Sequence, residues 1–87
     1  MAQIGGNIEQ LEALTRQFNT QAGQVDALIS AINNQMGSTW WIGPRADKFK
    51  SEWDQQFVPT LRKLSEALRE AGQDVTTTAR NLQAAGS

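Results

Sequence analysis

Apolar residues recur at alternating steps of four and three along the first half of the chain, from Ile4 to Met36. Thr15 fills the one position of this series that is not apolar, and no proline interrupts it. A heptad stripe sustained over more than four repeats predicts an amphipathic helix over about residues 7–36, with Gly37 as its C-terminal stop. The members that we expect at a core or dimer contact include Leu11, Phe18, Val25, Ile29 and Ile32.

A second helix is predicted over about residues 44–83. Pro44 is favoured at the first helical position because its missing N–H leaves no bond unmade, and Gly43 supplies a permissive backbone before it. A second apolar stripe follows. Its members are Ala46, Phe49, Trp53, Phe57, Leu61, Leu64, Leu68, Ala71, Val75 and Leu82, with Thr78 completing the series.

The middle of the second stripe departs from the heptad. Every step from Phe49 to Leu61 is four residues, which lets the stripe drift around the helix. Pro59 falls in this stretch and removes one internal hydrogen bond. We therefore expect a bend near residues 55–59.

The connection over residues 37–43 is short, so the two helices must run antiparallel. The predicted fold is all-α, a single helical-hairpin domain over residues 1–87. Such a hairpin has one internal contact, and the apolar surface exceeds what that contact can cover. We therefore expect two hairpins to pair into an elongated four-helix bundle. The surplus comes from Leu14, Leu28, Trp40, Trp41 and Phe57.

The composition argues against several classes of function. The sequence contains no cysteine and no histidine, so it lacks thiolate ligands, the commonest general base and the commonest transition-metal ligand. We predict no cofactor, no metal site and no enzymatic activity. The formal net charge is −1 with scattered basic residues, which predicts no nucleic-acid partner. No apolar run approaches the roughly 20 residues that span a bilayer. The N-terminus lacks the basic start and apolar core of a signal peptide.

The connection between the helices carries a Trp-x-Gly turn, formed by Trp41, Ile42 and Gly43. Ala46, Phe49 and Trp53 follow it. The central turn, its downstream spacing and the length of the chain resemble the WXG family of small type VII (Esx) secretion substrates. The resemblance covers the whole chain. Trp41 and Gly43 would form the motif read by the secretion machinery or a partner, with Trp40, Ala46, Phe49 and Trp53 in support.

The resemblance implies a dimer with itself or with another WXG-family chain, and a membrane-bound ATPase as a further partner. It also implies leaderless secretion of the folded pair from a cytoplasmic pool. One feature departs from the family: its members carry a Tyr-x-x-x-Asp/Glu export signal after the second helix, and this sequence has no tyrosine. A partner chain or a degenerate signal would have to serve instead.

Other interpretations remain open. The chain could be an intracellular targeting chaperone that pairs with a larger toxin-type substrate. A membrane-active amphipathic protein is not expected, because acidic and basic residues are mixed on the polar faces. Trp41 could simply cover the hairpin end, while Trp40 points elsewhere. The column of Phe49, Trp53 and Phe57, spaced four residues apart, is typical of a packed core.

Overall fold

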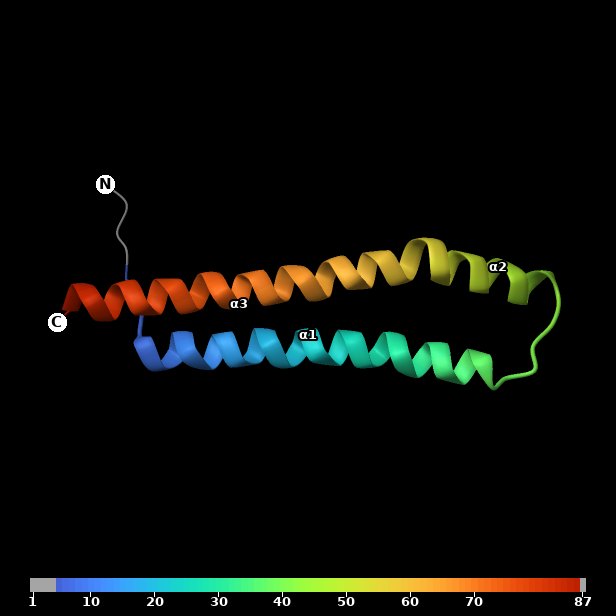
Figure 1. Cartoon of the computed structure of the whole chain (residues 1–87), viewed down its shortest axis with the longest axis horizontal. Coiled ribbons are helices and arrows are strands. Elements are labelled where there is room, and N and C mark those ends of the chain that lie inside the picture. The colour runs from blue at the N-terminus through green and yellow to red at the C-terminus, as the bar shows by residue number, and fades with distance from the viewer. Residues whose placement is uncertain (1–4, 87) are drawn as a thin grey trace.

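The computed structural model of the chain describes residues 5–86, so Ile4 of the predicted stripe lies outside the described residues. Helix α1 spans Ile8–Gly37, α2 spans Pro44–Glu52, a π-helical turn η1 spans Trp53–Phe57, and α3 spans Val58–Gly86. Figure 1 shows α2, η1 and α3 as one continuous helical arm that runs back along α1. The predicted all-α antiparallel hairpin is therefore confirmed.

Both ends of α1 are capped by side chains. Asn7 is the N-cap, and its Oδ1 accepts a hydrogen bond from the backbone N–H of Gln10 at 3.0 Å. At the other end the helix stops at Gly37, as expected, but not through a left-handed glycine, because Gly43 alone has a positive φ among the described residues. Instead, Ser38 donates its backbone N–H and its hydroxyl to the carbonyl of Asn34. A serine, and not the glycine, caps the helix.

The contact between α1 and α3 is built from small residues. Ala22 on α1 and Ser65, Gly72 and Ala79 on α3 are all buried. The Ser65 hydroxyl donates to the backbone carbonyl of Ala22, and the Thr15 hydroxyl donates to that of Gly72, both at 3.3 Å. A short side chain reaches the backbone of the opposite helix only when the two helices lie close together. The heptad therefore specifies a close helix pair.

The predicted stripe of the second helix is off by one residue at Leu64 and Thr78, whereas its members Leu61, Leu68, Val75 and Leu82 are half-buried. Leu64 and Thr78 are exposed, and the residues that follow them, Ser65 and Ala79, make the contact with α1. The cause is steric: Ser65, Gly72 and Ala79 are spaced by seven and let the backbones approach, so the larger side chains are displaced to the edge of the contact.

The predicted bend near residues 55–59 overlaps η1, and Figure 1 shows the arm changing direction there. In an α-helix the ring of Pro59 would clash with the carbonyl of residue 55, four positions earlier. The wider turn avoids this, and the backbone N–H of Val58 bonds to the carbonyl of Trp53. The extra residue of the π-turn also absorbs the drift of the four-residue steps. Trp53 consequently faces α1, where it is 6 % exposed.

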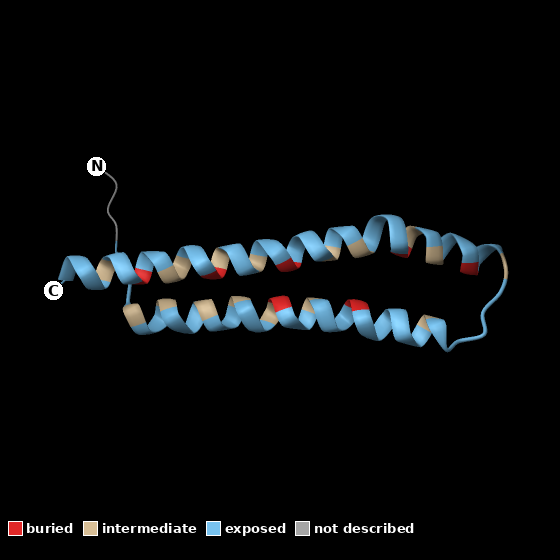
Figure 2. Ribbon diagram, viewed as in Figure 1, coloured by how far each residue is buried: buried red, intermediate tan, exposed pale blue. Residues whose placement is uncertain are grey.

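The hairpin is a single layer of helix. Its principal dimensions are 63 × 26 × 12 Å, and its radius of gyration is 19.1 Å, whereas a compact domain of this length has roughly 12 Å. Figure 2 shows the buried residues confined to the edges along which the two arms face each other. Domains are usually built from two packed layers around a core. This chain supplies one layer.

Candidate functional site

The Trp-x-Gly turn is held in shape at both ends. Thr39 donates its backbone N–H to the carbonyl of Met36 at 3.3 Å, which directs the chain away from α1. Gly43 has a backbone φ of 139°, a conformation that residues other than glycine rarely adopt. Its carbonyl accepts a hydrogen bond from the backbone N–H of Asp47 at 3.0 Å. Pro44 then occupies the first position of α2. The predicted backbone roles of Gly43 and Pro44 at the start of the second helical arm are confirmed.

The two adjacent indoles of the turn differ strongly in exposure. Trp41 is 42 % exposed, and its ring lies 6.1 Å from that of Phe49. Trp40 is 89 % exposed and Ile42 is 78 % exposed. The turn therefore packs one aromatic ring against the helical arm and presents an indole and an isoleucine side chain to solvent.

Phe49 is the centre of an aromatic cluster at this end of the hairpin. Its ring centroid lies 6.3 Å from that of Trp53, in a stacked arrangement, and 6.4 Å from that of Phe57. Trp53 donates its indole N–H to Oδ1 of Asn33 on α1 at 2.7 Å. Ala46 is fully buried nearby on α2. The structure thus brings together Trp41 and the predicted supporting residues Phe49 and Trp53, but leaves the supporting residue Trp40 outside the cluster.

The two long edges of the helix pair differ in character. Asp26 lies four positions after the buried contact residue Ala22, and Arg69 lies four positions after the buried contact residue Ser65. The two side chains pair at 2.7 Å, so residues that follow a contact residue by four positions lie along the same edge. The same offset of four positions places further polar residues on this edge: Asn19, Asn33, Arg62 and Thr76. We call this edge the polar face.

Residues placed one before or three after a contact residue lie on the opposite edge. In both helices most of these positions are apolar, although Gln21 and Thr78 are polar. Among the predicted contact residues, Ile29 is buried. The half-buried ones are Leu11, Phe18, Val25, Leu61 and Leu68. The exposed ones are Ile32, Phe57 and Leu64, and the neighbouring Leu14 and Leu28 are exposed as well. We call the set of Leu11, Leu14, Phe18, Val25, Leu28, Ile32, Phe57, Leu61, Leu64 and Leu68 the apolar face.

The ion pair on the polar face titrates in a predictable direction. The hydrogen bond from Arg69 lowers the pKa of Asp26 below its ordinary value of 3.8. Because the folded pKa is depressed, the pair stabilises the fold above pH 3.8, and this contribution is lost as pH falls through the folded pKa.

We therefore expect the carboxyl carbon signal of Asp26 in NMR spectra to titrate with a midpoint below 3.8. Arg69→Gln should raise that midpoint, because the strongest stabilising donor is lost. Both groups are about half exposed, so the effect on stability will be small. An identical midpoint in the wild type and in Arg69→Gln would show that the pair does not form in solution.

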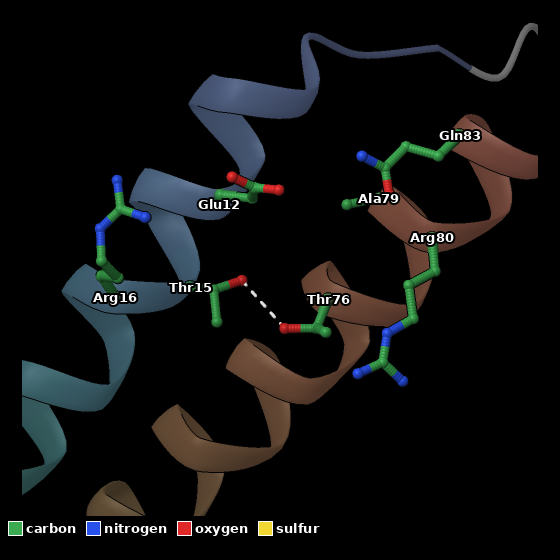
Figure 3. A pocket seen from close by; sticks show the side chains of 7 residues that line it. All are labelled: Glu12, Thr15, Arg16, Thr76, Ala79, Arg80 and Gln83. Atoms are coloured by element: carbon green, nitrogen blue, oxygen red, sulfur yellow. Dashed lines mark hydrogen bonds between the residues drawn. The ribbon is translucent and has the colours of Figure 1, made fainter. Parts of the chain in front are cut away.

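A groove of about 350 Å³ lies on the polar face near the open end of the hairpin. The hydroxyl of Thr76 donates to that of Thr15 across its floor at 3.3 Å. Figure 3 shows the side chains of Arg16 and Arg80 on opposite sides of this pair, with guanidinium groups that do not converge. The groove results from small residues at the helix contact and does not assemble a charged site.

Several residues of this arrangement were not predicted from the sequence. Ser65, Gly72 and Ala79 could have been found, because small residues at heptad spacing signal close helix packing. Asn33 and Lys50 gave no such signal. Lys50 donates from Nζ to the backbone carbonyl of Trp41 at 3.2 Å, and Asn33 accepts from Trp53; neither partner is close in sequence.

The described helices include none long and apolar enough to span a lipid bilayer. No family model, no curated protein and no solved structure matches this chain.

Proposed function

We propose that this chain is a small binding protein that works as a dimer, in which the apolar faces of two hairpins meet to form a four-helix bundle. The observation that carries the proposal is the apolar face on a single layer of helix. Leu14, Leu28 and Leu64 are each more than 40 % exposed, and they lie on the same edge. A second hairpin placed on that edge supplies the missing layer.

The total surface area supports this pairing. The chain exposes 6772 Å², whereas a compact monomer of 9.6 kDa exposes roughly 5,100 Å². The excess of roughly 1,700 Å² is greater than the roughly 800 Å² that each partner buries in an interface of standard size. A dimer can therefore bury much of the excess.

Within this proposal the protein is a substrate of a type VII (Esx) secretion system, exported as a folded pair. The support is the resemblance of the Trp41–Gly43 turn and its downstream residues to the WXG family, together with a turn that displays Trp40 and Ile42 outward. The second copy, or a related hairpin, is the partner in the pair. The secretion ATPase is the partner that reads the turn. The protein acts by binding and not by catalysis.

The dimer is tested by light scattering on the purified chain, alone and after mixing with the product of the neighbouring gene. A mass of twice 9.6 kDa for the chain alone, or of the sum of both chains for the mixture, supports the proposal. A monomer in both samples at millimolar concentration contradicts it. Stable pairing with the N-terminal region of a much longer protein would instead favour the targeting-chaperone alternative.

The role of the turn is tested by export from a bacterium with an active type VII system. We expect Trp41→Arg to reduce the amount of protein in the medium by about tenfold or more, the effect of losing one aromatic contact at a recognition surface. Helicity by circular dichroism should be unchanged, because Trp41 lies outside the helices. Gln24→Arg, on an exposed part of α1, adds the same charge and is the control. Normal export of Trp41→Arg would remove the turn from the proposal.

A further inference from the structure

Two side chains outside the Trp-x-Gly motif contact the residues that shape it. Asn33, near the end of α1, accepts the indole N–H of Trp53 at 2.7 Å. Lys50, on α2, donates to the main-chain carbonyl of Trp41 at 3.2 Å. The sequence separation between partners is 20 residues in the first pair and 9 in the second. Both bonds therefore tie together segments that secondary structure alone leaves independent.

The bond from Trp53 to Asn33 fixes the base of the aromatic cluster. Trp53 is 6 % exposed, so its indole N–H must find a partner inside the protein, and Asn33 is the acceptor. The bond holds the indole plane in one orientation. Phe49 stacks on that plane with an interplanar angle of 17°, and Trp41 packs on Phe49 in turn. The orientation of Trp53 is thereby passed to the turn through ring contacts.

The bond from Lys50 fixes the main chain of the turn. It occupies the carbonyl of Trp41, which lies in the non-helical segment between α1 and α2. With the Trp41 ring held by Phe49 and its carbonyl held by Lys50, the residues on either side of Trp41 are directed away from the cluster. These residues, Trp40 and Ile42, are the most exposed large apolar side chains among the described residues.

We propose that Asn33 and Lys50 are positioning residues that hold the Trp-x-Gly turn in the shape presented to its binding partner. The inference rests on the proposed function, because it requires the turn to be read. A preformed turn does not have to be ordered when it binds, so less conformational entropy is lost in recognition. The motif is therefore larger than its tripeptide: it includes an acceptor on α1 and a donor on α2.

The test compares variants that remove each bond with variants that keep it. Asn33→Leu removes the acceptor, whereas Asn33→Asp retains an oxygen at the same place. Lys50→Met removes the donor and keeps the aliphatic stem, whereas Lys50→Arg keeps a donor. Asn34→Leu adds the same apolar side chain at the next position, which is exposed, and serves as the control for Asn33→Leu. Asn33 lies on the polar face and Lys50 lies outside the apolar face, so we expect these variants to leave the dimer mass unchanged.

The first readout is NMR of the turn in the full chain, with no partner present. We expect Asn33→Leu to speed hydrogen exchange of the Trp53 indole N–H by about tenfold, the scale of one lost hydrogen bond. Both Asn33→Leu and Lys50→Met should also increase the mobility of the main-chain amides of residues 39–43. The Asp and Arg variants and Asn34→Leu should resemble the wild type. Unchanged turn amides in both bond-removing variants would overturn the inference.

The second readout is export from a bacterium with an active type VII system, measured with the dimer mass and the melting temperature of each variant. We expect Asn33→Leu and Lys50→Met to lower export about tenfold at unchanged dimer mass, with recovery in Asn33→Asp and Lys50→Arg. A loss of export that the conservative variants do not restore, or full export despite a mobile turn, would overturn the inference. Normal export of Trp41→Arg would instead remove recognition of the turn from the proposed function, and the NMR readout would then decide whether Asn33 and Lys50 hold the turn.

Discussion

Gly72→Leu is expected to lower the free energy of unfolding by about 1–3 kcal/mol, the usual cost of forcing extra side-chain volume into a packed contact. A Cβ atom at position 72 would lie 3.2 Å from Oδ1 of Asn19 and 3.7 Å from Cβ of Phe18. The Asn19 side chain can move aside for one carbon, but not for the whole leucine side chain without separating the helices. Separation would also break the bond from Thr15 to the carbonyl of residue 72.

Gly23→Leu is the matched control for that experiment. Gly23 also lies within a helix, but a Cβ at this position meets nothing within 4 Å. We expect it to stabilise the protein by about 0.8 kcal/mol, the gain in helix propensity from glycine to leucine. The same gain at position 72 offsets part of the steric cost. Urea unfolding at one fixed protein concentration measures both variants, since dimer stability depends on concentration. Equal unfolding midpoints for the two variants would show that the helices do not pack closely at Gly72.

The hairpin could be predicted from the sequence because two of its determinants are local. The heptad stripe needs only the positions of apolar residues, and Gly43 with Pro44 needs only the conformational preferences of those two residues. The side of the second helix that meets the first was harder to predict. Apolar patterning gives weight to Leu64, whereas close packing selects its neighbour Ser65 because it is small. Distinguishing the two requires knowing how far apart the helix axes lie, and no single-helix pattern contains that distance.

The candidate site could be predicted in part for the same reason. Trp41, Phe49 and Trp53 meet because a four-residue spacing brings side chains together on one helix and the turn folds Trp41 back upon them. Pro59 indicated a bend, but the wide turn from Trp53 to Phe57 depends on how the second arm must face α1 on both sides of it. The bonds made by Asn33 and Lys50 arise only after the arms are in place. Asparagine and lysine are common on exposed helix surfaces, so neither residue was distinctive in the sequence.

Replacing two leucines of the apolar face with glutamate is expected to abolish the dimer. Leu28→Glu combined with Leu64→Glu places a carboxylate on each helix of the face and removes four leucine side chains from the dimer, two from each copy. Because each leucine is about half exposed in the hairpin, its burial in the dimer is worth about 1 kcal/mol. A total loss of about 4 kcal/mol in dimerisation free energy corresponds to a roughly 1,000-fold increase in the dissociation constant. Burying unpaired carboxylates would add to the loss. Light scattering should therefore report 9.6 kDa at concentrations where the wild type has twice that mass.

The control for this variant is Gln24→Glu combined with Gln73→Glu. Both glutamines are exposed and lie outside the apolar face, one on α1 and one on α3, and the change in net charge is the same. The control should keep the mass of the wild type, so that a difference between the two double variants reports the face and not the charge. Solution mass is the readout, and helicity is not, because a hairpin released from its partner can also lose helicity. If the leucine variant kept the dimer mass, the two hairpins would have to meet through another surface, and the apolar face would no longer carry the proposed function.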